Sequence, residues 1–151
     1  MAEERRRGAS VRLARARSGP LHHHDLCFGC GQANLFGLQL EVDQREDGVV
    51  AGRFFVKQDH QGPPGHAHGG ILATALDEAM ALLVHASGVH AFTTGLEIRL
   101  RAPAAVGAFV EIEARRESQE GRRLELSAVA ASEGVEVATA RGTFVEVERP
   151  G

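Results

Sequence analysis

One stretch of this sequence constrains the fold more than any other: residues 69–87 form a long helical pattern almost without polar side chains. The run is rich in Ala and Leu, and Gly88 follows it as a C-terminal stop signal. A helix that is apolar around its whole circumference cannot face water. The sequence therefore predicts a single long helix that other elements must enclose.

The segments on both sides of this helix alternate between apolar and polar residues, which is typical of strands with one buried face. Two strands are predicted before the helix, at residues 36–42 and 49–56, with a turn at Asp47-Gly48 between them. Four are predicted after it, at residues 92–101, 109–115, 124–130 and from a turn at Glu133-Gly134 to about residue 148. This order indicates an α+β domain in which one antiparallel sheet curls around one helix.

The composition limits the class of protein. A chain of 151 residues, with 43% hydrophobic and 25% charged residues, suits one soluble domain. The most apolar run, residues 71–84, is shorter than the roughly 20 residues of a membrane helix, and Asp77 and Glu78 interrupt it. Neither a signal peptide nor a disulfide framework is indicated, so we expect a cytoplasmic protein.

The first 20 residues differ from the rest in charge. They carry six Arg and two Glu, a net charge of +4, which leaves −7 on the remainder of a chain whose total is −3. Such a tail can bind nucleic acid or a membrane surface. This tail has no aromatic residue for stacking, however, and Glu3 and Glu4 argue against an organellar transit peptide. We expect a flexible basic arm at residues 1–20 and a domain at residues 21–151, with neither nucleic acid nor a membrane as partner.

Asp77 is the candidate for chemistry within the helix. Its neighbours three and four positions away are Ala73, Thr74, Met80 and Ala81. A carboxylate in mostly apolar surroundings is costly to ionise, so its pKa should rise unless a donor meets it. Such a group suits a general base or a nucleophile. The alternative is that Asp77 meets a donor from a partner chain or lies at an exposed edge.

His68-Gly69-Gly70 stands at the predicted helix start, where unpaired N–H groups can hold an anion or a developing oxyanion. Alternatively, the two glycines only permit a tight turn. Gly69 and Asp77 are eight residues apart, about 12 Å along a helix, so one helix cannot bring both to one reacting atom. If both act together, the sites must lie between the subunits of at least a dimer.

Residues 61–77, which run from Gln61 through His68-Gly69-Gly70 to Asp77, resemble the helix-start motif of hotdog-fold thioesterases. The phenylacetate-pathway type and its mitochondrial acyl-CoA thioesterase relatives are most similar. Their pattern is His-Gly-Gly followed by an Asp nine residues after the His. The lead-in Cys27-Phe28-Gly29-Cys30-Gly31, with Asn34 and Gly37-Leu38, and the strand at residues 93–103 are also similar, so that the resemblance covers roughly residues 26–147.

This resemblance implies an acyl-CoA thioesterase with the hotdog fold and no cofactor. In the family the Asp is the general base or nucleophile, and the first Gly N–H polarises the thioester carbonyl. The His shapes the loop, and a Ser or Thr on the next strand assists the attacking water. These roles fall on Asp77, Gly69, His68 and Thr93. A homo-oligomer, either a dimer or a dimer of dimers, that takes an acyl-CoA substrate is implied as well.

The residues implied to contact the substrate are Gly70, Gln61 and Gly62. Some members of the family carry an Asn six residues before the His, where Gly62 stands here. Any carbonyl contact of that Asn must therefore be absent or replaced, with Gln61 as a candidate.

Cys27 and Cys30, with His22, His23 and His24 nearby, could supply a tetrahedral zinc site. The usual second Cys pair or spaced His pair is missing, so we expect structural thiols and no metal. The sequence also lacks a Gly-x-Ser-x-Gly elbow and a phosphate-binding loop.

Two rival functions remain. A hotdog domain could bind acyl-CoA or another small ligand without hydrolysing it, although a pure binder has no need of a buried carboxylate at Asp77. A hotdog dehydratase or hydratase would need a second acid or base, and the sequence offers none that stands out. Since the chain has no Trp and no Tyr, its acyl pocket must be built from Phe, Leu, Val and Ala.

Overall fold

The computed structural model describes residue 21 and residues 23–148, so the predicted arm at residues 1–20 lies outside the described residues. Two strands, β1 (Glu41–Glu46) and β2 (Val49–Phe55), precede a short 3-10 helix, η1 (Gln58–His60), and the long helix α2 (Gly69–Ala86). Four strands follow: β3 (Ala91–Leu100), β4 (Phe109–Glu120), β5 (Arg123–Ser132) and β6 (Val135–Glu146). The predicted order of two strands, one helix and four strands is confirmed.

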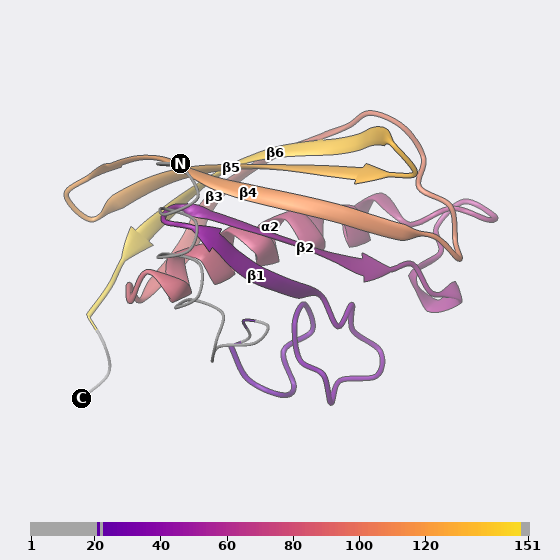
Figure 1. Ribbon diagram of the computed structural model, residues 1–151, viewed down its shortest axis with the longest axis horizontal. Coiled ribbons are helices and arrows are strands. Elements are labelled where there is room, and N and C mark those ends of the chain that lie inside the picture. The colour runs from indigo at the N-terminus through magenta and orange to yellow at the C-terminus, as the bar shows by residue number, and fades with distance from the viewer. Residues whose placement is uncertain (1–20, 22, 149–151) are drawn as a thin grey trace, which may run out of the picture.

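The strands form one six-stranded sheet in the order β1-β2-β4-β5-β6-β3, and every neighbouring pair is antiparallel. Figure 1 shows this sheet curving over α2, which lies along one of its faces. This is the predicted α+β hotdog arrangement. The strand that directly follows the helix, β3, pairs with β6 and forms one edge of the sheet.

Local sequence signals place the elements. Gly48 and the pair Glu133-Gly134 have positive φ angles, as tight hairpin turns require. α2 begins where the His68 side chain accepts a hydrogen bond from the Gly70 N–H. The buried face of α2 packs into one core with the strands before and after it. The largest fully buried side chains of this core include Leu76, Met80, Leu83, Phe54 and Phe144. Burying each of these side chains contributes about 1.5–3 kcal/mol.

The prediction that α2 is enclosed all round is wrong for one face. Eight of its residues, from Leu72 to Val84, are buried, but Ala73, Thr74, Asp77 and Ala81 are only half-buried. A single curved sheet covers one side of a helix and leaves the opposite side open. By length and composition alone α2 could cross a membrane, yet it is packed on the sheet with 44% of its span buried, as a core helix is.

The first predicted strand, residues 36–42, is also wrong in its bounds, because β1 begins only at Glu41. The alternation there is real: Leu38 and Leu40 are buried, and their N–H groups donate to the carbonyls of Phe28 and Gly29. Leu38 and Leu40 belong to an irregular segment, residues 23–40, which we call the lead-in, and they pair with an earlier part of that segment. Pairing with a loop produces the same burial pattern as pairing with a strand.

Candidate active site and a neighbouring cluster

Asp77 lies in the middle of α2 beside the first residues of β3. The Thr93 hydroxyl donates a hydrogen bond to Asp77 Oδ1 at 3.0 Å. The β3–β6 pairing is irregular between Thr93 and Gly95, and such a bulge can re-aim a side chain. Burial raises the pKa of the Asp77 carboxyl above its ordinary value, and the Thr93 hydrogen bond opposes that shift. The raised pKa predicted from the sequence is therefore found, and its main cause is burial.

The helix start presents one free amide. His68 Nδ1 accepts a hydrogen bond from the Gly70 N–H at 2.8 Å, which leaves the Gly69 N–H without an acceptor among the described residues. A Cβ at Gly69 would lie 2.8 Å from Leu100 Cδ1, so a glycine permits this close approach. The Gly69 N–H is thus available to an external acceptor at the positive end of α2.

The loop before the helix is bonded within itself. Gln61 Oε1 accepts from the Gly65 N–H at 2.6 Å, and the Gly62 N–H donates to the His66 carbonyl at 2.9 Å. A Cβ at Gly62 would lie 2.7 Å from His68 Cα, so an Asn at this position would require the loop to shift. The three residues expected to contact substrate, Gly70, Gln61 and Gly62, therefore use these polar groups to hold the loop, and their contact with a substrate stays a prediction.

The structure thus brings the predicted site residues into two groups. Asp77 and Thr93 meet between α2 and β3, while His68, Gly69 and Gly70 meet at the start of α2. Gly69 and Asp77 are eight positions apart in α2, about 12 Å along its axis. Within one chain the two groups cannot contact the same carbonyl.

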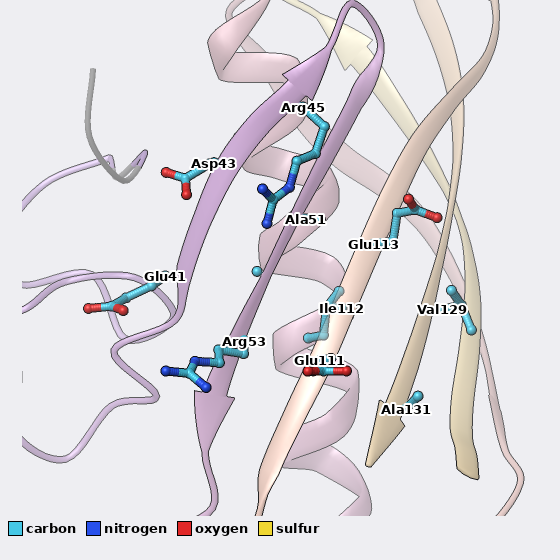
Figure 2. A pocket seen from close by; sticks show the side chains of 11 residues that line it. Glu41, Asp43, Arg45, Ala51, Arg53, Glu111, Ile112, Glu113, Val129 and Ala131 are labelled. Atoms are coloured by element: carbon cyan, nitrogen blue, oxygen red, sulfur yellow. The ribbon is translucent and has the colours of Figure 1, made fainter. Parts of the chain in front are cut away.

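A hollow of about 280 Å³ lies between the second half of α2 and the start of β3. Thr93 lines it, and its apolar walls include Ala81, Val84, Phe92 and Phe144. A larger hollow of about 470 Å³ lies on the outer face of the sheet, away from α2. Figure 2 shows that mostly charged side chains of β1, β2 and β4 surround it, and neither Asp77 nor Thr93 lines it. The smaller hollow therefore belongs with the candidate active site.

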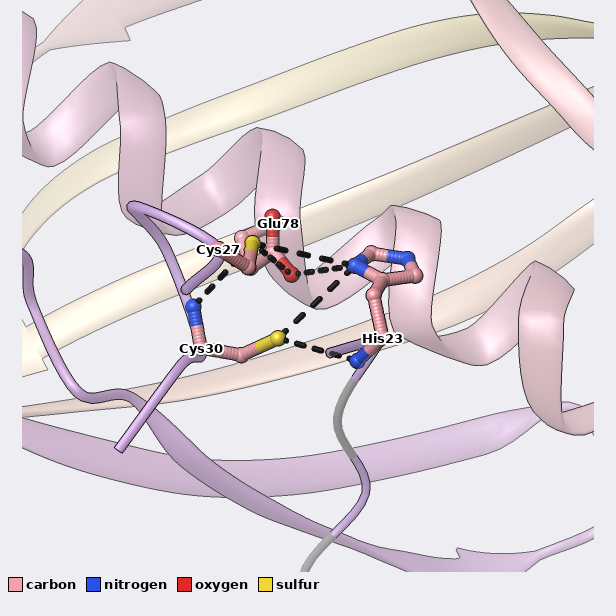
Figure 3. A group of neighbouring side chains, drawn as sticks. All are labelled: His23, Cys27, Cys30 and Glu78. Carbon is pink, nitrogen blue, oxygen red and sulfur yellow. Dashed lines mark hydrogen bonds and ion pairs between the residues drawn. The ribbon is translucent and has the colours of Figure 1, made fainter. Parts of the chain in front are cut away.

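A second cluster lies on the lead-in side of α2 and was not anticipated as a unit. His23, Cys27, Cys30 and Glu78 converge so that one donor atom of each lies within 4.8 Å of the others (Figure 3). The sequence pointed to the two cysteines and to a histidine near them, but not to Glu78. The signal that could have found it is the presence of a second acid in an otherwise apolar helix.

The groups of this cluster shift one another's ionisation. Hydrogen bonds with Cys30 and Glu78 raise the pKa of His23 to about 11. Burial opposes the charge on Glu78, but hydrogen bonds from His23 and Cys30 outweigh it and hold the pKa of that carboxyl below its ordinary value. Burial also raises the pKa of the Cys30 thiol. His23 is therefore held as a cation beside the ionised Glu78 carboxylate.

Comparison with known proteins decides the family. The sequence model of the thioesterase superfamily matches residues 64–139, half of the chain, including all of α2 and the candidate site residues from His68 to Thr93. The chain belongs to the thioesterase superfamily. The resemblance seen in the sequence is thereby confirmed.

Individual relatives agree with this membership. The human acyl-coenzyme A thioesterase THEM5 is 31% identical over 90 residues, which cover 58% of this chain and 36% of the human protein. The match therefore spans about a third of that relative's length. A hypothetical thioesterase protein of Streptococcus pneumoniae TIGR4, solved with coenzyme A, superposes with a TM-score of 0.69 at 21% identity over 74% of this chain and 88% of the other. The E. coli PaaI protein of the phenylacetic acid degradation operon superposes with a TM-score of 0.69 at 19% identity, over 74% of this chain and 81% of the PaaI chain. These two structures share the fold of this superfamily member.

Proposed function

We propose that this chain is an acyl-CoA thioesterase, which hydrolyses the thioester of an acyl- or aryl-CoA to the free acid and CoA. The observation that carries the proposal is the half-buried Asp77 carboxylate held by the Thr93 hydroxyl beside a partly apolar hollow. Membership of the thioesterase superfamily supports it, as does the human relative's name.

In the proposed mechanism Asp77 acts as general base and removes a proton from water, or attacks the carbonyl carbon itself. Thr93 fixes the carboxylate and helps to place the water. The thioester carbonyl oxygen accepts a hydrogen bond from the free Gly69 N–H, which stabilises the oxyanion as the tetrahedral intermediate forms. That intermediate collapses with loss of the CoA thiolate, which takes up a proton. If Asp77 has attacked directly, the collapse leaves an acyl anhydride on Asp77, which water then hydrolyses to the free acid and the carboxylate.

Both groups serve one thioester only if two chains share each site, so we propose a homodimer or a dimer of dimers. The edge strand β3 supports this arrangement. Phe92, Leu96 and Leu100 on β3 are exposed by 61%, 42% and 58% of their surfaces. Large apolar side chains beside an unpaired sheet edge mark a surface for another protein, and a second copy would place its α2 start near Asp77.

The hollow beside Thr93 is the proposed place for part of the acyl group. The apolar part of its wall, which includes Ala81, Val84, Phe92 and Phe144, suits an aliphatic or aryl acid, and His23, His85 and His90 line the rest.

The deciding experiment measures free thiol release from a panel of acyl-CoA thioesters by the wild type and by Asp77→Asn. The two side chains are nearly isosteric, but the amide neither attacks nor accepts a proton. We expect the variant to fold and to lose about 10²–10⁴-fold in kcat.

A folded Asp77→Asn protein with wild-type turnover would refute the mechanism. Tight acyl-CoA binding without thiol release by the wild type would instead establish the rival function, a non-catalytic binding domain. Hydration of an enoyl-CoA without thiol release would point to a hydratase.

A further inference from the structure

The cluster of His23, Cys27, Cys30 and Glu78 supplies no reacting group to the proposed hydrolysis, although His23 also lines the hollow beside Thr93. It has the composition of a metal site (Figure 3). We propose that these four residues bind one zinc ion, which clamps the lead-in onto α2. The proposal is independent of the thioesterase activity.

The spacing of the donors fits a tetrahedral ion. His23 Nδ1 lies 3.9 Å from Cys27 Sγ and 3.7 Å from Cys30 Sγ, and Cys27 Sγ lies 3.5 Å from Glu78 Oε2. Zinc bonds of about 2.0–2.3 Å at tetrahedral angles give donor–donor distances of about 3.3–3.8 Å. A fourth distance, 2.9 Å from His23 Nδ1 to Glu78 Oε2, is that of a direct contact and needs to open by about 0.4 Å. In the other two pairs, Cys27–Cys30 and Cys30–Glu78, the donor atoms lie within 4.8 Å of each other.

The chemistry of the donor set selects the metal. Two thiols, one imidazole and one carboxylate suit zinc, whereas calcium and magnesium take oxygen donors. Binding changes no oxidation state: the thiol protons of Cys27 and Cys30 and the Nδ1 proton of His23 leave to solvent, as the sulfurs become thiolates and the imidazole becomes neutral. Four protein donors leave no open position, so the ion is structural.

Backbone amides donate hydrogen bonds to both cysteine sulfurs, which stabilises them as thiolates. The backbone N–H of His23 donates to Cys30 Sγ at 3.2 Å, and the backbone N–H of Cys30 donates to Cys27 Sγ at 3.5 Å. Such outer hydrogen bonds orient ligands and stabilise their charge. Cys30 is fully buried, and the side chains of Glu78 and His23 are only 12% and 29% exposed.

The close wrap of the lead-in also depends on glycine. A Cβ at Gly29 would lie 2.6 Å from the Glu78 side chain, and one at Gly31 would lie 2.3 Å from the Asp25 carbonyl oxygen. The lead-in contains no strand or helix of its own within residues 23–40. A zinc ion held by three of its side chains and by Glu78 would fix it where no regular backbone pairing does.

The test uses the full chain, purified with a reductant. Metal content is measured by elemental analysis, zinc affinity by titration against a competing chelator, and geometry by the absorption of the cobalt(II)-substituted protein. We expect one zinc per chain, a tetrahedral thiolate-cobalt spectrum, and a Tm that falls when a chelator removes the ion.

Glu78→Gln and Cys30→Ser should each weaken zinc binding at least about tenfold. Adding a chelator should then no longer lower the Tm of either variant. His24→Gln is the matched control, since this neighbouring histidine lies outside the cluster, and it should bind zinc like the wild type. Glu78→Gln keeps the test decisive if the buried Cys30 variant fails to fold.

Three results would overturn the proposal: reduced, folded wild type that binds no zinc; a Cys27–Cys30 disulfide that persists under reductant; or wild-type zinc affinity in folded Glu78→Gln protein.

Discussion

At the scale of single residues, two side chains on adjacent elements make the centre of the candidate site. The Thr93 hydroxyl donates to one oxygen of Asp77, and the second oxygen remains for water or substrate. A hydroxyl that positions a carboxylate contributes less than the carboxylate itself. The two residues should therefore differ in what their loss does to turnover.

Thr93→Ala should slow kcat on the order of tenfold, because a hydrogen bond to a charged group contributes about 1.5 kcal/mol at the lower end of its range. Thr93→Ser should restore most of the rate. The matched control is Thr94→Ala, since the Thr94 hydroxyl donates to the Thr143 carbonyl instead. Equal losses in Thr93→Ala and Asp77→Asn, measured by thiol release, would mean that the ranking of the two roles is wrong.

At the scale of elements, the loop that leads into α2 is held by one buried histidine. His60, at the end of η1, is 1% exposed; its Nδ1 accepts the Lys57 N–H at 3.1 Å and its Nε2–H donates to the Gly37 carbonyl at 3.2 Å. Its own carbonyl receives the His68 N–H at 2.8 Å. A neutral imidazole therefore links η1, the lead-in and the start of α2.

Burial lowers the pKa of His60 below its ordinary 6.5. As the pH falls, the unfolded chain protonates His60 at a higher pH than the folded chain does. The contribution of His60 to the unfolding free energy is therefore complete above pH 6.5 and is lost as the pH falls through the folded pKa. We expect His60→Gln to have a lower Tm at about pH 7.5 but a smaller further drop toward about pH 5.5 than the wild type.

A difference of 1 kcal/mol in the unfolding free energy would change Tm by about 2–4 °C in a chain of this size. His66→Gln, in the same loop, controls for the general effect of removing a histidine. If His60→Gln keeps the full acid sensitivity of the wild type in thermal scans, His60 is not its source.

Elements with local signals could be predicted from the sequence. α2 was predicted to begin at Gly69 and ends one residue before the predicted Ser87, and the hairpin turns at Gly48 and Gly134 are where the glycines indicate. The bounds of β1 could not be predicted, because Leu38 and Leu40 are buried by a loop instead of a strand. The contact between Glu78 and the lead-in was equally hidden, since nothing local says which segment covers a given helix face.

At the scale of the whole molecule, the two halves of the proposed site lie at different places on one rigid helix. A shared site predicts complementation between two inactive chains. Asp77→Asn removes the base, and Gly69→Pro removes the amide. His68 has φ −66° and ψ 139°, a conformation that tolerates a following proline. Since a Cβ at position 69 meets Leu100, the second chain also carries Leu100→Ala.

Heterodimers of these two chains, purified with two different affinity tags, should have one site with both intact groups and one with neither. Their thiol-release rate should approach half that of the wild type, while each parent stays inactive. Leu100→Ala alone should keep most of its activity. Heterodimers as inactive as their folded parents would contradict the shared site.

The position of β3 in the sheet has a consequence for how the protein is made. A ribosome releases β3 long before β6, yet β6 is the strand with which β3 pairs. Until β6 emerges, the backbone N–H and C=O groups of β3 have no partner strand, and a chaperone can bind this unpaired segment of the nascent chain. The contact between Thr93 and Asp77 depends on β3 being in place. The candidate active site of each newly synthesised chain is therefore completed only after translation of β6.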